Sequence, residues 1–210
     1  MKKRLAEIAY LPHFLSHPIN GFWEIKKEKR GSLFTALLLL AAYLLSVILS
    51  TFFTSYLFNP YGDFLESVNL FRILLPPVGL WLLWCVSSWC LTSLFDGEGS
   101  FRDICVATSY ALIPLIIVTL LQTAFSHMLT LNEEAVYQLI QGFGYLWFGF
   151  LLVLGTLVTH QYTFTKTLLI VLCTILGMCI ILYIALLFIN LLQQMVSLGT
   201  LLNYELSMRR

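Results

Sequence analysis

The sequence has few charged residues for its length. Charged residues make up 11% of the 210 and hydrophobic residues 59%, whereas an ordinary soluble domain has about 25% charged and about 45–50% apolar residues. Residues 73–95 and 104–126 contain no Asp, Glu, Lys, Arg or His. A soluble globule could not cover so much apolar surface with so few charges. The composition therefore predicts an integral membrane protein.

The apolar runs also lack the residues that several kinds of membrane chemistry require. A proton-coupled carrier keeps ionisable side chains within its spans, and an intramembrane protease needs paired Asp, Ser with His, or an H-E-x-x-H zinc site. None of these patterns occurs in the runs. The five cysteines show no C-x-x-C spacing. We therefore expect no catalytic residue, no cofactor and no metal site, and hence no enzyme.

Neither a nucleic acid nor a metal ion is indicated by the remaining polar residues. Seven of the twelve Lys and Arg residues lie in the first thirty positions, so no basic domain surface is expected. His13 and His17 are four residues apart, but prolines flank them and no third ligand is near. His127 and His160 stand singly at the ends of predicted connections, which favours hydrogen-bonded bystanders over catalytic groups.

Five runs are long and apolar enough to cross a membrane, for which about 20 residues suffice. A β-barrel would instead show alternating segments of about 10 residues. The pattern predicts an all-α integral membrane protein with an N-terminal interfacial helix and a short C-terminal amphipathic tail. The expected domains are a cytoplasmic or interfacial segment 1–32, a transmembrane domain 33–192 and an extracytoplasmic tail 193–210. The predicted spans cover about residues 33–58, 73–95, 104–125, 139–158 and 168–192.

The N-terminal segment places aromatic residues beside basic ones. Prolines interrupt its apolar stretch and no small-residue cleavage pattern follows, so a removable signal peptide is not indicated. Phe22 and Trp23 next to Lys26 and Lys27 are typical of a helix at the cytoplasmic headgroups. The alternative is a plain positive-inside signal, and the two are compatible.

Charge asymmetry predicts the orientation of the spans. With five spans and a cytoplasmic N-terminus, nine Lys and Arg residues fall inside and three outside. The positive-inside rule therefore favours a multi-pass protein of the cell membrane with its N-terminus in the cytoplasm and its C-terminus outside. Residues 96–103 then face the cytoplasm.

Residues 96–103, D-G-E-G-S-F-R-D, form a charged turn between the second and third predicted spans. One interpretation is structural: a glycine-containing turn in which Ser100 or Asp103 caps the third helix. A calcium site would need more oxygen ligands than D-G-E-G offers. The other interpretation is a docking surface for a cytoplasmic partner, formed by the turn and by residues of the N-terminal segment: Asp96, Glu98, Ser100, Phe101, Arg102, Asp103, Phe22, Trp23, Lys26 and Lys27.

Two further features concern the shape and packing of the spans. Pro114 removes a backbone hydrogen bond near the middle of the third span, so we expect a kink there, with Thr108 or Ser109 helping to satisfy the freed groups. Gly142, Gly149 and Thr156 repeat at seven-residue spacing in the fourth span. Small residues on one face allow a neighbouring helix to approach closely.

Two short motifs suggest a family. An N-terminal Pro-x-x-x-Phe-x-x-Ile-Lys element is present as Pro18, Phe22, Ile25 and Lys26, and the glycine-rich turn with its Ser-Phe pair is followed by an aromatic-x-x-x-Pro element that ends at Pro114. In these features the chain resembles the bacterial branch of the Yip (Ypt-interacting protein) family. The resemblance implies five spans, a cytoplasmic N-terminus and a non-enzymatic protein that works through partners. Eukaryotic relatives contact small GTPases, and some bacterial members resemble accessory subunits of transport systems, including ABC-type sugar importers.

Two functional hypotheses follow. The first is an accessory or scaffold subunit of a larger membrane complex, for example an ABC-type carbohydrate transporter, whose partners are membrane lipids and other integral membrane subunits in a hetero-oligomer. The second is a stand-alone transporter or scramblase of lipid or another apolar solute, with the kink at Pro114 as its gate. A lipid substrate would need no buried charge.

Overall fold

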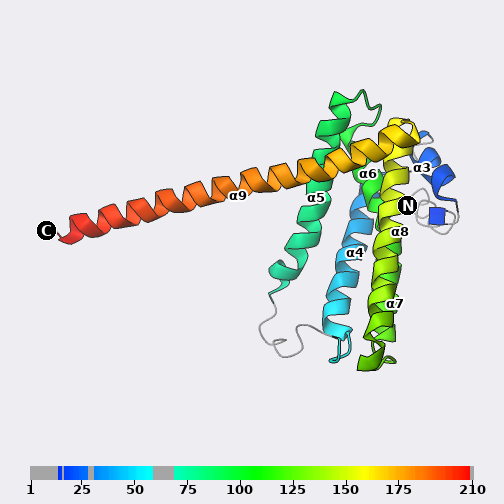
Figure 1. Ribbon diagram of the computed structural model, residues 1–210, viewed down its shortest axis with the longest axis horizontal. Helices are drawn as coiled ribbons and strands as arrows, with labels where there is room; N and C mark the ends of the chain where they lie inside the picture. Colours follow the sequence, from blue (N-terminus) through cyan, green and yellow to red (C-terminus); the bar gives the residue numbers. More distant parts are fainter. Residues whose placement is uncertain (1–13, 16, 28–30, 59–68, 209–210) are drawn as a thin grey trace.

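The computed structural model describes residues 14–15, 17–27, 31–58 and 69–208, without the side chains of 202–207. Within these residues the regular structure is helical (Figure 1). The elements in order are α3 (Pro18–Lys27), α4 (Leu33–Phe53), α5 (Leu70–Leu94), α6 (Phe101–Ala111), α7 (Ile113–Phe125), the 3₁₀ turn η2 (Leu131–Glu133), α8 (Glu134–His160) and α9 (Phe164–Met208). Five helical segments are long and apolar enough to cross a membrane. The predicted all-α fold of a membrane protein is thereby confirmed.

The third span, made of α6 and α7, is the centre of the bundle. Within its most apolar window 72% of the residues are buried, compared with 17% to 33% in the other four spans. Every residue of α6 from Ile104 to Ala111 is buried. The main core cluster forms where α3, α4 and α8 pack around α6, and Tyr110 of α6 lies at its middle with 1% of its surface exposed.

Pro114 breaks the third span, as predicted, but the freed backbone groups are satisfied in a different way. α6 ends at Ala111 and α7 begins at Ile113, with Pro114 in the first turn of α7, where a missing N–H costs least. The N–H of Leu112 donates to the carbonyl of Ser109 at 3.2 Å and is shared with the carbonyl of Tyr110, four residues before the proline. The Thr108 and Ser109 hydroxyls donate one turn earlier, to the carbonyls of Ile104 and Cys105. The expected role of Thr108 or Ser109 is therefore replaced by a tightened last turn.

The helix starts agree with their expected caps. Ser32 and Ser100 each form a capping box, with Thr35 and Asp103 respectively, which satisfies two of the free N–H groups at each start. Ser32 is thus the N-cap of α4, and the predicted capping role of Ser100 and Asp103 is confirmed. α5 starts earlier than expected, at Leu70, because Asn69 accepts a hydrogen bond from the N–H of Phe71 at 2.9 Å.

The bundle has two distinct ends. At one end, here called the α3 end, lie α3, the charged turn of residues 96–103 and the link from α8 to α9 (Figure 1). At the opposite end, here called the Ser126 end, the link from α7 to α8 is tied to α4. The Ser126 hydroxyl accepts from the N–H of Ser55 at 2.9 Å, and Nε2 of His127 lies 2.8 Å from the carbonyl oxygen of Phe53.

Helix α9 differs from the predicted fifth span and tail. It is one continuous helix of 45 residues, so no boundary separates the span at about 168–192 from the tail at 193–210. No proline occurs between Phe164 and Met208 to end the helix. Figure 1 shows α9 passing α5 near the α3 end and then running out beyond the bundle, across the direction of α4, α5, α7 and α8.

Close helix packing in α8 uses glycines other than those we expected. A Cβ at Gly142 or Gly149 would have no described atom within 4 Å, so neither packs against a described helix. A Cβ at Gly144 would lie 2.8 Å from Val118 of α7, and one at Gly155 would lie 3.2 Å from Phe22 of α3. Positions seven apart drift by only about 20° on an ideal helix, so Gly142 and Gly149 share a face, but that face meets no described helix. Thr156 is buried and donates to the carbonyl of Leu152.

The glycines of α8 allow a matched test of this packing. Gly144→Ala should lower the free energy of unfolding by about 1–3 kcal/mol, because the added methyl group overpacks Val118. Gly142→Ala should leave it unchanged or raise it by up to about 1 kcal/mol, since alanine favours the helix. The measurement is SDS titration of the purified protein in detergent micelles. Equal gains in both variants would show that α7 and α8 are not in close contact at Gly144.

Candidate functional site

Three segments that are far apart in the sequence meet at the α3 end. The ammonium group of Lys26 in α3 donates to the carbonyl of Thr159 in the last turn of α8 at 2.6 Å and lies 3.6 Å from the carboxylate of Glu98 in the charged turn. Lys166 of α9 donates to the carbonyl of Phe95, at the end of α5, at 2.9 Å. Cations at helix C-termini satisfy free carbonyls and oppose the negative end of the helix dipole. These lysines therefore tie the segments to one surface.

The charged turn is narrow because its glycines lie directly against α8. A Cβ at Gly97 would be 2.5 Å from Nδ1 of His160, and a Cβ at Gly99 would be 2.7 Å from Cε1 of the same ring. Neither glycine has a positive φ. The left-handed position of the turn is Asp96, with φ of 55°. Any side chain at Gly97 or Gly99 would clash with the imidazole of His160, and this is why glycine is needed at both positions. The sequence had suggested backbone conformation as the reason.

His160 is the residue around which the turn closes. It is 2% exposed, and its Nδ1 accepts a hydrogen bond from the N–H of Gly99 at 3.3 Å. Because Nδ1 is the acceptor, a neutral ring carries its proton on Nε2. Protonation of Nδ1 would set two N–H groups against each other and break this contact. The imidazole also stacks on Tyr162, with ring centroids 5.4 Å apart.

Tyr162 joins the turn to the ends of α5 and α9. Its hydroxyl donates to the carbonyl of Phe95 at 3.1 Å, and the ammonium group of Lys166 lies 4.4 Å from its ring centroid. Burial raises the pKa of Tyr162 above its ordinary value, and the Asp96 carboxylate raises it further. The hydroxyl therefore stays protonated and remains a donor. Sequence reasoning missed His160 and Tyr162 as site residues, although their place directly after an apolar run marks a helix C-terminus.

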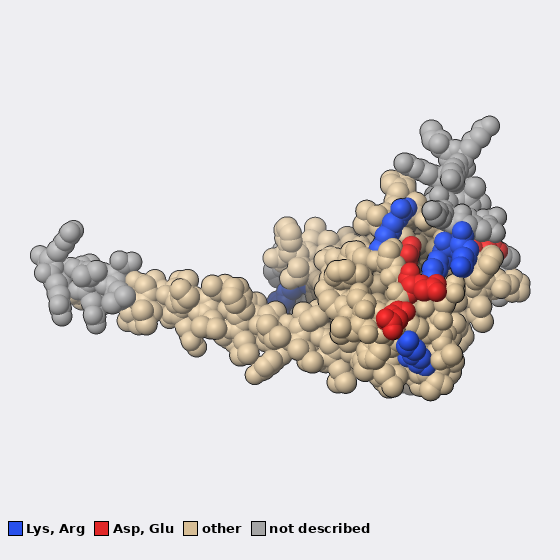
Figure 2. All heavy atoms as spheres, turned by 90° about the horizontal axis from the view of Figure 1, so that it is seen from above, with Lys and Arg blue, Asp and Glu red and all other residues tan. Residues whose placement is uncertain are grey.

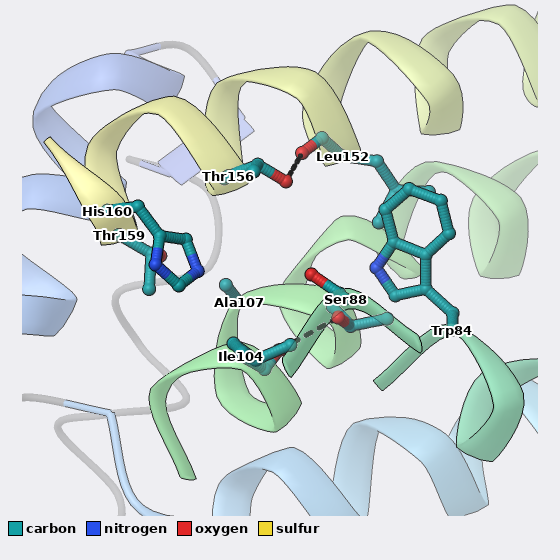
Figure 3. Close-up of a pocket in the computed structure, with 10 residues that line it drawn as sticks. Trp84, Ser88, Ile104, Ala107, Leu152, Thr156, Thr159 and His160 are labelled. Carbon is teal, nitrogen blue, oxygen red and sulfur yellow. Dashed lines mark hydrogen bonds between the residues drawn. The ribbon is translucent and has the colours of Figure 1, made fainter. Parts of the chain in front are cut away.

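Beneath the turn lies a small cavity of about 10 Å³, with His160 at one end and Trp84 at the other (Figure 3). The hydroxyls of Thr156 and Thr108 that line it donate to carbonyls of their own helices. This volume is about that of one water molecule. The cavity is too small for a substrate, so its polar groups serve the packing of α5, α6 and α8.

The ten residues predicted to form a docking surface separate into buried and exposed groups. Phe22 is 2% exposed and packs edge-on against Phe14, so it belongs to the core and presents no surface. Ser100 and Asp103 hydrogen-bond to each other across the capping box. Lys26 is committed to Thr159 and Glu98. The exposed members of the ten at this end are Trp23, Lys27, Asp96, Glu98, Ser100, Phe101 and Arg102.

The charges of this end form a mixed patch. Figure 2, which looks onto the α3 end, shows basic and acidic side chains gathered over one part of the bundle, while the described side chains of α9 from residue 180 onward, the α9 arm, include none. The described charged residues here are Glu24, Lys26, Lys27, Asp96, Glu98, Arg102, Asp103 and Lys166. Acidic and basic groups are equal in number, so this described surface is not a basic patch. Across the described residues, no three His, Cys, Asp or Glu side chains are placed to share a metal ion; His13 lies outside them.

The contact between His160 and the turn can be tested by removing the acceptor. His160→Leu should lower the free energy of unfolding by about 1–3 kcal/mol, because the N–H of Gly99 is left without its partner. His127→Leu is the matched control, since His127 is exposed and bonds a carbonyl at the other end of the bundle. We expect a smaller loss there. SDS titration of both variants in micelles measures the difference. Equal losses would show that the hydrogen bond between His160 and Gly99 contributes no more to stability than the contact of His127.

Comparison with protein families finds a match to the Yip1 domain over residues 13–191. Comparison with curated proteins and with solved structures finds no match. The family match covers more than half of the chain and includes α3, the charged turn, the break at Pro114 and most of α9. It agrees with the resemblance carried by the N-terminal element and by the turn. The chain therefore belongs to the Yip1 domain family.

Proposed function

We propose that this multi-span membrane protein is a scaffold, an accessory subunit that joins other membrane proteins into a complex. One observation carries the proposal: α9 extends from the bundle with an apolar surface that no other described helix covers. From residue 182 to residue 198 every position of α9 is exposed. Only its first part packs on the bundle, for example at Gly177 against Ser87 and at Thr174, whose carbonyl accepts from Ser87.

The composition of the α9 arm, residues 180–208, favours contact with other membrane helices. Its apolar residues occur all around the helix, and residues 184–189 are all apolar. A helix that lies on a membrane surface needs one polar face, and this arm has none over that stretch. At about 1.5 Å per residue, 45 residues span roughly 65 Å, about twice the hydrocarbon thickness of a bilayer. Such a helix reaches well beyond its own bundle.

The α3 end supplies a second contact surface of a different kind. Its mixed charges and its exposed aromatic side chains, Trp23 and Phe101 among them, suit recognition by a protein, because aromatic residues are enriched at interfaces and paired charges set orientation. The excess of basic residues in the N-terminal segment supports a cytoplasmic position for this end. We propose that partners in the cytoplasm bind here while integral membrane subunits bind α9.

In-cell photo-crosslinking tests the proposal with a matched pair of positions. Phe188 of α9 and Phe150 of α8 are both apolar, at 61% and 57% exposed. A benzoylphenylalanine residue at position 188 should crosslink to another protein in the source membrane, because the arm is the contact. The same group at position 150 should give lipid adducts alone. Gel mobility and mass spectrometry identify the products.

The crosslinked products distinguish a scaffold from a protein that acts alone or only with its own copies. Crosslinks from position 188 to permease or ATPase subunits would identify a transport complex as the partner. Adducts with lipid alone at both positions would overturn the scaffold proposal, as would a product made only of two copies of this chain. Expression of each variant in a host that lacks the partner provides the background.

A further inference from the structure

Two adjoining cavities lie among α4, α5, α7 and α8, and α6 and the packed part of α9 also line the smaller one. Neither the charged turn nor the α9 arm lines them. The larger measures about 510 Å³ and extends toward the Ser126 end, and the smaller measures about 220 Å³ and lies nearer the α3 end. Five residues line both cavities: Tyr43, Pro77, Leu80, Leu115 and Tyr145. Together they reach the size of small-molecule sites, which are about 300–1,000 Å³.

The larger cavity is polar but uncharged. Its wall includes the hydroxyls of Ser50, Thr54 and Thr119 and the amides of Gln122 and Gln141, and none of its lining residues is Asp, Glu, Lys, Arg or His. Hydroxyl and amide groups can both donate and accept hydrogen bonds. The cavity can therefore hold a group with several hydroxyls but offers no counter-charge.

The smaller cavity is mainly apolar. Leu112, Phe148, Leu152 and Met178 contribute to its wall. Protein interiors hold few voids larger than a water molecule, and apolar cavities stay dry and accept apolar ligands. An apolar space of this size beside a polar one is therefore suited to a hydrocarbon chain.

The hydroxyl groups of Tyr43 and Tyr145 lie in the wall that the two cavities share. The hydroxyl of Tyr43 forms no hydrogen bond with any described residue, and Tyr145 accepts from the amide of Gln141 at 3.4 Å. Trp81 lines the smaller cavity, and its Nε1 is buried with no acceptor among the described residues. Buried donors almost always have partners. The indole N–H is shielded by the surrounding atoms, so the hydroxyls that a ligand in the cavities can meet here are those of Tyr43 and Tyr145.

We infer that the paired cavities bind an uncharged lipid of the acylglycerol class, with its hydroxyl-bearing head in the larger cavity and hydrocarbon chain in the smaller. A phosphate or ammonium head would be desolvated there without a counter-charge, which is costly within a membrane. A polar solute without a chain would leave the smaller cavity empty. The site does not depend on the scaffold role, because neither the α9 arm nor the charged turn lines it.

The test uses a photoreactive lipid probe on the full-length protein in phosphatidylcholine nanodiscs. The probe is a monoacylglycerol with a diazirine and an alkyne in its chain, and the comparison probe is a lysophosphatidylglycerol with the same chain. The neutral probe should label peptides of the helices that line the smaller cavity, α4 to α9, and an excess of unlabelled monoacylglycerol should remove the label. Leu80→Trp should reduce labelling about tenfold by filling the junction.

The control variant is Leu82→Trp, two residues along the same helix. Leu82 is 47% exposed and lines neither cavity, while Leu80 is 56% exposed and lines both. Leu82→Trp should label like the unmodified protein. Equal labelling by the neutral and anionic probes would overturn the uncharged class. Labelling that Leu80→Trp does not reduce, or no labelling above background, would overturn the site.

Discussion

The burial of the third span, complete from Ile104 to Ala111 in α6, is the constraint on which the other helices depend. Its apolar run could cross a membrane alone, but in the structure it is the most buried of the five spans, and Tyr110 and the residues around it form the core. With no water to bond its backbone, the break at Pro114 must be satisfied internally, which the N–H of Leu112 does. α3, α4, α5 and α8 are held in place by packing on this central helix.

At the α3 end, side chains bonded to the last carbonyls of two helices hold the exposed residues in place. α5 and α8 both end there, and their last carbonyls are bonded by Lys166, Tyr162 and Lys26. Because these side chains are committed to carbonyls, the charged turn is held against His160 and its exposed residues keep a defined arrangement. A preorganised surface loses less conformational entropy on binding. This is the physical basis for a docking role at this end.

Two features of the molecule have no partner among the described residues: the apolar surface of the α9 arm and the paired cavities of the bundle. The arm of α9 exposes apolar residues over more length than a bilayer requires, and the bundle contains a pair of open cavities, one with hydroxyl and amide groups in its wall and one mainly apolar. We propose other membrane helices as the partners of the first and a lipid as the ligand of the second. The two proposals together assign a partner and a lipid to the same Yip1 domain.

The apolar runs by themselves determined the membrane class and the helical spans, because every backbone group must be bonded within a span. Ser32, Ser100 and Pro114 likewise determined helix starts and the break, since these effects are local. Tertiary structure alone decided that Phe22 is core, that Gly144 and Gly155 are the packed glycines of α8, and that His160 holds the turn. These outcomes depend on which helices become neighbours, and contacts between residues distant in sequence leave no local pattern.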